Sequence, residues 1–140
     1  MVRIMNIKDF SIGMSFTYNR TVSKSDIDRY ATITGDTNPV HLDDKYAKES
    51  MFGAPIAHGM LIAGFVSKVF GSDLPGPGCI YVSQNIKFTK PVYIDDSLDV
   101  YVEIMSIDFD KRRLTFKTEC RTGRGVVLAG SAELLIPELN

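Results

Sequence analysis

The chain of 140 residues is long enough for one domain and leaves little room for a second, so we expect a single domain over residues 1–140. Hydrophobic residues make up 44% and charged residues 24%, the balance of an ordinary globular protein that builds its own core. The formal net charge of -1 provides no broad basic field, so we expect neither nucleic acid nor an anionic membrane as a partner.

A strand and a helix are the first expected elements. Residues 16–22 suit a strand, and Ser23 then begins a helix with Asp26 three residues later, a pair that satisfies free N–H groups at a helix start. Gly35 ends this helix, because glycine tolerates a positive φ. The apolar face of the helix is expected to contain Ile27, Tyr30, Ala31 and either Ile33 or Thr34.

The middle of the chain contains turn signals and two further helices. Residues 37–39, Thr-Asn-Pro, favour a turn, a short helix is expected at 44–49, and a loop passes through 53–55. Residues 58–70 are almost wholly apolar, with Lys68 as their only charge, so we expect a helix that is buried on most sides. Small residues should let a sheet approach it closely: Ala57, Gly59, Ala63, Gly64 and Ser67.

The second half alternates between apolar and polar residues, which indicates antiparallel strands with one covered face. Turns are expected at 75–78, 95–96 and 122–125. The inward residues are expected to be Ile80, Val82, Ile86 and Phe88, then Leu98, Val100, Val102 and Ile104, then Leu114, Phe116, Thr118 and Cys120, and finally Val126, Leu128, Ala132, Leu134 and Ile136. One apolar helix beside such strands predicts a two-layer α+β domain with a curved antiparallel sheet around the helix.

The location of the protein is predicted from three features. Residues 1–10 contain no continuous apolar run, so we expect no signal peptide. The longest apolar stretch, residues 60–66, is far shorter than the roughly 20 residues that span a bilayer. Cys79 and Cys120 have no spacing typical of metal or redox sites, and reduced, mostly buried thiols suit a cytoplasmic protein.

Asp36 and His41 form the strongest candidate for chemistry. Asp36 lies just past the expected helix end, and Pro39 restricts the loop that follows, so both side chains could point at one water molecule. Histidine suits proton transfer because its reference pKa is about 6.5. The residues alone leave a structural interpretation open, since aspartate before Asn-Pro is a common turn composition.

A resemblance to a known family supports the chemical interpretation. Residues 30–41, YATITGDTNPVH, resemble the hydratase 2 signature of the MaoC-like (R)-specific enoyl-CoA hydratases. Further similar segments follow in order at 55–61 (PIAHGML), at 74–78 (LPGPG) with 80–81 (IY), and at 88–96 (FTKPVYIDD). The chain is most similar to the short single-domain hydratases linked to polyhydroxyalkanoate supply, and it keeps the family's aspartate, asparagine, proline and histidine.

The resemblance implies a fold and an activity. The fold is the hot dog, an antiparallel sheet wrapped around a long central helix, in homodimers whose sheets join edge to edge. The activity is (R)-specific hydration of trans-2-enoyl-CoA to (R)-3-hydroxyacyl-CoA, or the reverse dehydration, with Asp36 as the base and His41 steering the water. The backbone N–H of Gly59 is the expected oxyanion-hole donor, and Ser67 is expected to assist His41 by a hydrogen bond.

Other side chains are expected to support this site. Asn38 is expected to support the loop through its amide, while His58 could orient the loop, contact substrate or only fill space. The acyl pocket is expected to be lined by Phe65, Val69 and Phe70, with bulky Phe70 favouring short acyl chains.

Coenzyme A is expected only as part of the substrate, with no separate cofactor. Candidates for binding its phosphates are Lys87, Lys90 and Arg112. We also expect no metal, because two histidines without an acidic partner at ligand spacing do not make a site.

Two other classes of function remain open at this point. A hot-dog acyl-CoA thioesterase would direct water at the thioester carbonyl and release a free thiol. A non-catalytic acyl-thioester-binding protein would bind enoyl-CoA without turnover. The direction of the reaction and the choice between coenzyme A and an acyl carrier protein are also open.

Overall fold

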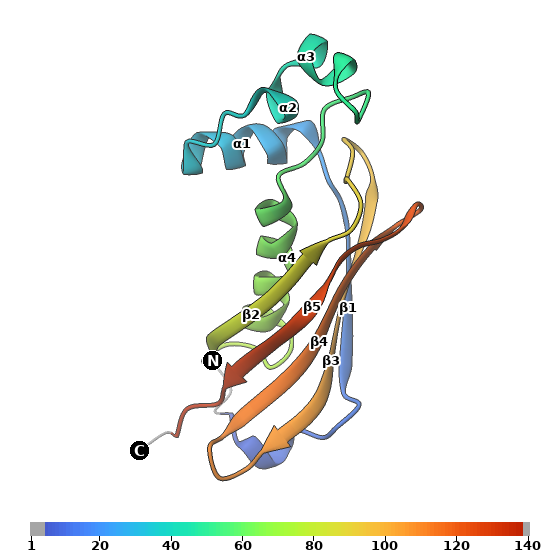
Figure 1. The fold of residues 1–140 in the computed structure, drawn as a ribbon. Helices are drawn as coiled ribbons and strands as arrows, with labels where there is room; N and C mark the ends of the chain where they lie inside the picture. The colour runs from blue at the N-terminus through green and yellow to red at the C-terminus, as the bar shows by residue number, and fades with distance from the viewer. Residues whose placement is uncertain (1–4, 139–140) are drawn as a thin grey trace.

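The computed structural model describes residues 5–138 and confirms the α+β class (Figure 1). All strand pairs of its five-stranded sheet are antiparallel, in the order β1-β3-β4-β5-β2. Among the described residues, no helix is long and apolar enough to cross a membrane. The elements are η1 (Ile7–Asp9), β1 (Ser15–Thr21), α1 (Lys24–Thr34), α2 (Pro39–Leu42), α3 (Asp44–Glu49), α4 (Gly59–Ser72), β2 (Ile80–Phe88), β3 (Ser97–Asp108), β4 (Arg113–Thr122) and β5 (Gly125–Leu135).

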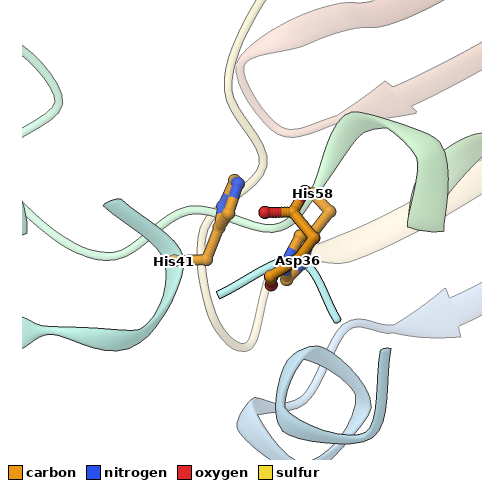
Figure 2. Close-up of side chains that lie close together, drawn as sticks. All are labelled: Asp36, His41 and His58. Atoms are coloured by element: carbon orange, nitrogen blue, oxygen red, sulfur yellow. The ribbon is translucent and has the colours of Figure 1, made fainter. Parts of the chain in front are cut away.

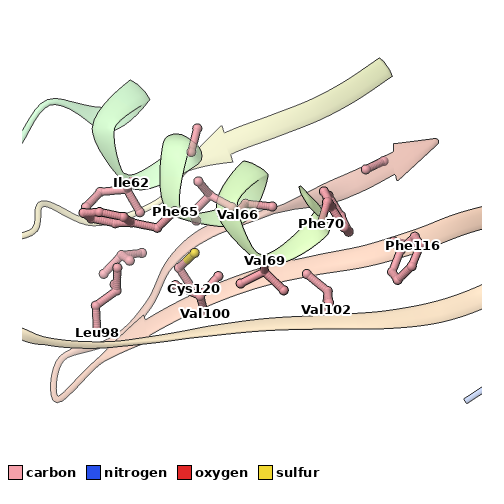
Figure 3. Packing of buried hydrophobic residues seen from close by; sticks show 14 of the residues in the cluster. Ile62, Phe65, Val66, Val69, Phe70, Leu98, Val100, Val102, Phe116 and Cys120 are labelled. Carbon is pink, nitrogen blue, oxygen red and sulfur yellow. The ribbon is translucent and has the colours of Figure 1, made fainter. Parts of the chain in front are cut away.

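The core lies between α4 and one face of the sheet (Figure 3). The inward residues predicted for β3 and β4 are confirmed, and each is at most 1% exposed. The helix contributes Ile62, Ala63, Phe65, Val66, Val69 and Phe70 to this core. Each large apolar side chain that is buried in this way stabilises the fold by about 1.5–3 kcal/mol, so the contact holds α4 firmly on the sheet.

β-Bulges shift the alternation in two other strands. The register of β2 against β5 shifts between Tyr81 and Ser83, and Tyr81, although 37% exposed, packs edge-on against Phe70 with ring centroids 5.2 Å apart. The prediction that Ile80 and Val82 face the core is therefore wrong, and they are 49% and 41% exposed. Phe88, which was also predicted to face the core, is 52% exposed.

A second bulge corrects the prediction for β5. The register of β4 against β5 shifts between Cys120 and Arg121. As a result Val127 is buried at 2% exposure, and Val126 is only half-buried. The other inward residues predicted for this strand are confirmed.

The ends of α1 are as predicted. Ser23 and Asp26 form the capping box, and Gly35 ends the helix in the left-handed region with φ of 79°. The apolar face is narrower than expected, because Ile33 is 84% exposed and Thr34 is also exposed. The short α2 was not predicted; it forms because the Asn38 side chain accepts a hydrogen bond from the Val40 N–H.

One side of α4 is uncovered, which contradicts the expectation that the helix is buried on most sides. Met60 is 57% exposed, and Gly64 and Ser67 are exposed as well. A Cβ atom at Gly64 would meet nothing within 4 Å, so this glycine does not serve close approach of the sheet. Gly59 does, since its Cβ atom would lie 2.9 Å from the Phe88 ring.

Candidate active site

A pocket of about 500 Å³ opens where α1, α2 and the start of α4 meet the segment after β2. It is largely apolar, with a few polar groups at one side, which is the usual composition of a small-molecule site. Its lining residues include Tyr30, Asp36, His41, Met51, Phe52, Ile56, His58, Gly59, Met60, Ile62, Phe88, Lys90, Val92 and Val127.

Three polar side chains gather in this pocket, and they come from three separate segments (Figure 2). Asp36 lies in the loop after α1, His41 is on α2, and His58 is the N-cap of α4. One side-chain oxygen or nitrogen atom of each residue lies within 4.8 Å of those of the other two. The structure thus brings Asp36 and His41 together as the sequence suggests.

Local hydrogen bonds shape the loop that carries Asp36. The Asp36 N–H donates to Thr34 Oγ1 at 3.2 Å, and Asp36 Oδ1 accepts from the Asn38 N–H at 3.2 Å. Asn38 Oδ1 in turn accepts from the Val40 N–H at 3.2 Å and caps α2. The side-chain amide of Asn38 therefore supports the loop by fixing its connection to α2, which is the role expected for it.

The orientation of His41 is set by one strong hydrogen bond. Its Nδ1 lies 2.7 Å from the backbone oxygen of Ile56, an acceptor, so Nδ1 carries the proton in the neutral ring. Nε2 is then left with a free lone pair. His41 can accordingly accept a hydrogen bond or a proton from a water molecule in the pocket.

His58 is the most deeply buried polar side chain of the site, with 2% exposure. Its Nε2 lies 3.1 Å from the backbone oxygen of Asp36, and its ring stacks on His41 with centroids 3.8 Å apart and planes inclined by 28°. Burial is the main cause that lowers the pKa of His58, so the ring is neutral near pH 7.

Gly59 opens α4 at the edge of the pocket. As the first residue of a helix its N–H has no intrahelical acceptor, and no other acceptor bonds it in the described part of the chain. The partial positive charge of a helix N-terminus adds to this donor. The Gly59 N–H is thus available to an oxygen that gains negative charge in the pocket.

Other predicted residues lie elsewhere. Ser67 is exposed and lines a second hollow, and within residues 5–138 it makes no hydrogen bond to His41. Phe65, Val69 and Phe70 lie in the core and do not line the pocket. The apolar lining that sequence reasoning missed includes Met51, Phe52, Met60, Ile62 and Phe88, which come from segments far apart in the chain and share no motif.

Only one of the three cationic residues predicted to bind phosphate lines the pocket. Lys90 lines the pocket, where its Nζ donates to the backbone oxygen of Arg124 at 2.6 Å. Lys87 is exposed on β2 but does not line the pocket. Arg112 lies in the β3–β4 turn at the opposite end of the sheet and donates to the backbone oxygens of Ile136 and Pro137, so within one chain it does not reach this pocket (Figure 1).

The expectation of no metal assumed that the two histidines lack an acidic partner, and this assumption is wrong. Asp36 is an acidic partner for both histidines, since the three groups lie within 4.8 Å. The two rings are stacked with an angle of 28°, however, so their in-plane lone pairs do not converge on one point. One nitrogen of each ring also faces a backbone carbonyl. The absence of a metal stays a prediction.

Comparisons with known proteins identify the family of the chain. The MaoC like domain model matches residues 9–125. The chain is 42% identical to the (R)-specific enoyl-CoA hydratase of Rhodospirillum rubrum, over 93% of this chain and 90% of that protein. It is 39% identical to the 3-hydroxybutyryl-CoA dehydratase of Methylorubrum extorquens, over 98% of this chain and 87% of that protein.

The fold is similar to that of a solved structure. An unliganded R-hydratase from Pseudomonas aeruginosa superposes with a TM-score of 0.89 at 36% identity, covering 95% of this chain and 86% of the other. The similarity confirms the hot-dog class expected from the sequence. From the matched domain and these relatives, the chain belongs to the MaoC-like domain family.

Proposed function

We propose that the chain is an (R)-specific enoyl-CoA hydratase, which adds water to trans-2-enoyl-CoA and catalyses the reverse dehydration. The observation that carries this proposal is the meeting of Asp36 and His41 in a pocket beside the free N–H of Gly59. A base, a water-orienting group and an oxyanion donor are the three parts that the reaction needs. The similarity to two curated enzymes of this chemistry supports it.

The proposed mechanism is syn hydration. Asp36 removes a proton from a water molecule while the water oxygen attacks C3 of the enoyl thioester. The π electron pair of the C2=C3 bond moves toward the thioester oxygen to give an enolate. As the enolate collapses, that pair returns to C2, which takes the proton that Asp36 removed from the water, relayed through the lone pair of His41 Nε2. The product contains one added hydrogen and one added hydroxyl, and the Asp–His pair ends in its starting protonation state.

The Gly59 N–H is proposed to hold the thioester oxygen while that oxygen gains charge. A preorganised donor of this kind acts mainly on the transition state, because the oxygen is most negative there. Coenzyme A enters only as part of the substrate, and Lys90 at the pocket is the supported candidate for its phosphates. A cytoplasmic location stays a prediction.

The test is to mix the purified protein with crotonyl-CoA and follow the loss of the conjugated double bond. The product is then offered separately to (R)- and (S)-specific 3-hydroxyacyl-CoA dehydrogenases. Oxidation by the (R)-specific enzyme alone is expected. Release of free thiol without hydration would identify a thioesterase instead, and binding without either reaction would identify a binding protein.

Replacing Gly59 by alanine should lower kcat/KM by about tenfold, although the N–H group is retained. The new Cβ would lie 2.9 Å from the Phe88 ring, so this ring must move within the pocket. Gly71→Ala is the matched control, because a Cβ there meets nothing within 4 Å on the same helix. Equal kinetics of the two variants would show that the contact between Gly59 and Phe88 does not shape the pocket.

The acyl chain is proposed to run along the uncovered side of α4. Met60 lines both the active-site pocket and the second hollow, which Ser67 and Tyr81 also line. Phe70 packs edge-on behind Tyr81, so two aromatic rings limit the hollow. We expect a lower kcat/KM for a twelve-carbon than for a four-carbon enoyl-CoA, and equal values would contradict this limit.

A homodimer is also proposed, formed by pairing of β2 edges. β2 ends the sheet, and its Val82 and Phe88 are 41% and 52% exposed beside the uncovered side of α4. Pairing would satisfy the free strand backbone and cover these side chains. Sedimentation should give twice the chain mass of 15.6 kDa. Val82→Lys should yield a monomer, while Thr17→Lys on the opposite edge strand β1 should leave the dimer intact.

A further inference from the structure

The loop that carries Asp36 has one hydrogen-bonded link to a distant segment. Within the described residues, the bonds of residues 35–38 are local, to Ala31, Thr34 and the start of α2. The exception joins the backbone oxygen of Asp36 to His58 Nε2 at 3.1 Å, across 22 positions of sequence. Because residues 35–38 are all exposed, packing contributes little to holding this loop.

The same His58 ring also contacts the second proposed catalytic side chain. It stacks on His41 at a centroid distance of 3.8 Å, while Tyr30 lies against it at 4.6 Å with an angle of 53°. One buried ring therefore touches the His41 ring and the backbone of Asp36, the two residues whose side chains are proposed to hold the water. The His58 side chain makes no capping hydrogen bond to α4, so a helix cap does not account for its polarity.

We propose that His58 is the positioning residue of this site, and that it sets the spacing between the Asp36 carboxylate and the His41 ring. Its Nε2–H holds the Asp36 backbone, and its ring face fixes the tilt of His41. This inference rests on the proposed function, because the spacing matters only where both groups act on one water. Misplacement by about 1 Å is enough to lower a rate by about 100-fold.

Three substitutions separate positioning from simple filling of space. His58→Phe keeps the stacked ring and loses the N–H donor, His58→Gln keeps a donor and loses the ring, and His58→Ala loses both. We expect kcat to fall by about 100-fold in His58→Phe with KM within about twofold, and further in His58→Ala. His58→Gln is expected to retain more activity than His58→Ala, since it keeps one of the two contacts.

Two kinetic results would contradict the positioning role of His58. A wild-type kcat in His58→Phe would show that an aromatic ring suffices, and it would overturn the proposal. The proposal would also be overturned if the loss of kcat were proportional to the loss of Tm across the three His58 variants. Ile104→Val is the control for stability, because it trims a fully buried side chain on β3 outside the pocket, and it should lower Tm without lowering kcat.

A spectroscopic readout tests the contact independently of activity. The protein has two histidines, so the ring-nitrogen NMR spectrum contains two sets of signals, and the His58→Phe variant assigns them. The structure predicts a proton on Nε2 of His58 and on Nδ1 of His41 at pH 7.5. A proton on Nδ1 of His58 would overturn the link to Asp36. The NMR spectrum tests the contact between His58 and Asp36 whether or not the protein hydrates crotonyl-CoA. Failure to hydrate crotonyl-CoA would reject the proposed function and not this contact.

Discussion

Replacing Asp36 by asparagine is expected to lower kcat for crotonyl-CoA by about 10³-fold, with little change in KM. The amide cannot accept the proton that the carboxylate removes from water. The substitution conserves shape, and the asparagine oxygen can still accept the Asn38 N–H that now bonds Asp36 Oδ1 at 3.2 Å. The loop should therefore keep its structure, and circular dichroism with thermal unfolding would verify this.

A second aspartate variant controls for a general effect of lost charge. Asp28→Asn removes a carboxylate from α1, where it pairs with Lys24 at 2.8 Å outside the pocket. Its kcat should equal that of the wild type. If Asp36→Asn also retained a kcat within about tenfold of the wild type, Asp36 would not be the base.

Replacing Gly130 by alanine is expected to destabilise the fold by about 3 kcal/mol or more. A Cβ atom at this position of β5 would lie 1.7 Å from the backbone oxygen of Asn85 and 2.8 Å from its carbonyl carbon. These atoms belong to the backbone of β2 and cannot rotate away, so the two strands must separate. Urea unfolding would measure the loss as a lower midpoint.

Gly123→Ala is the matched control for this substitution. Gly123 lies in the turn between β4 and β5, and a Cβ there meets nothing within 4 Å. Its midpoint should stay close to that of the wild type. A Gly130→Ala protein with an unchanged midpoint would mean that the close approach of β5 to β2 is absent in solution.

The parts of the fold that local chemistry determines were predictable from the sequence. Ser23, Asp26 and Gly35 mark the ends of α1 because capping and a left-handed turn depend on the residues themselves. Alternation identified the inward residues of β3 and β4 because no bulge interrupts either strand between its predicted inward residues.

The alternation of apolar and polar residues gave wrong inward residues where contacts between distant segments determine which way a side chain points. The bulges in β2 and β5 each add one residue, and a pattern of apolar and polar residues does not show where that residue lies. The same pattern cannot show that β2 is an edge strand, so Ile80, Val82 and Phe88 were wrongly assigned to the core.

The candidate site was also predictable from the sequence only in part. Asp36 and His41 lie five positions apart in a restricted loop, so their meeting could be inferred from the sequence and the family resemblance. The stacking of His58 on His41 depends on how α4 meets α2, which no local pattern encodes. The apolar lining has the same origin, since Phe52 and Phe88 reach the pocket from a loop and from the end of β2.

The central claim is that Asp36 and His41 act on one water as a unit, and a double-mutant cycle tests it most directly. The kcat of the wild type, Asp36→Asn, His41→Gln and the double variant would be measured with crotonyl-CoA at one pH. If the two groups share one step, the double variant should lose about as much kcat as the more impaired single variant. A loss equal to the product of the two single losses would contradict the claim and show that the residues act independently.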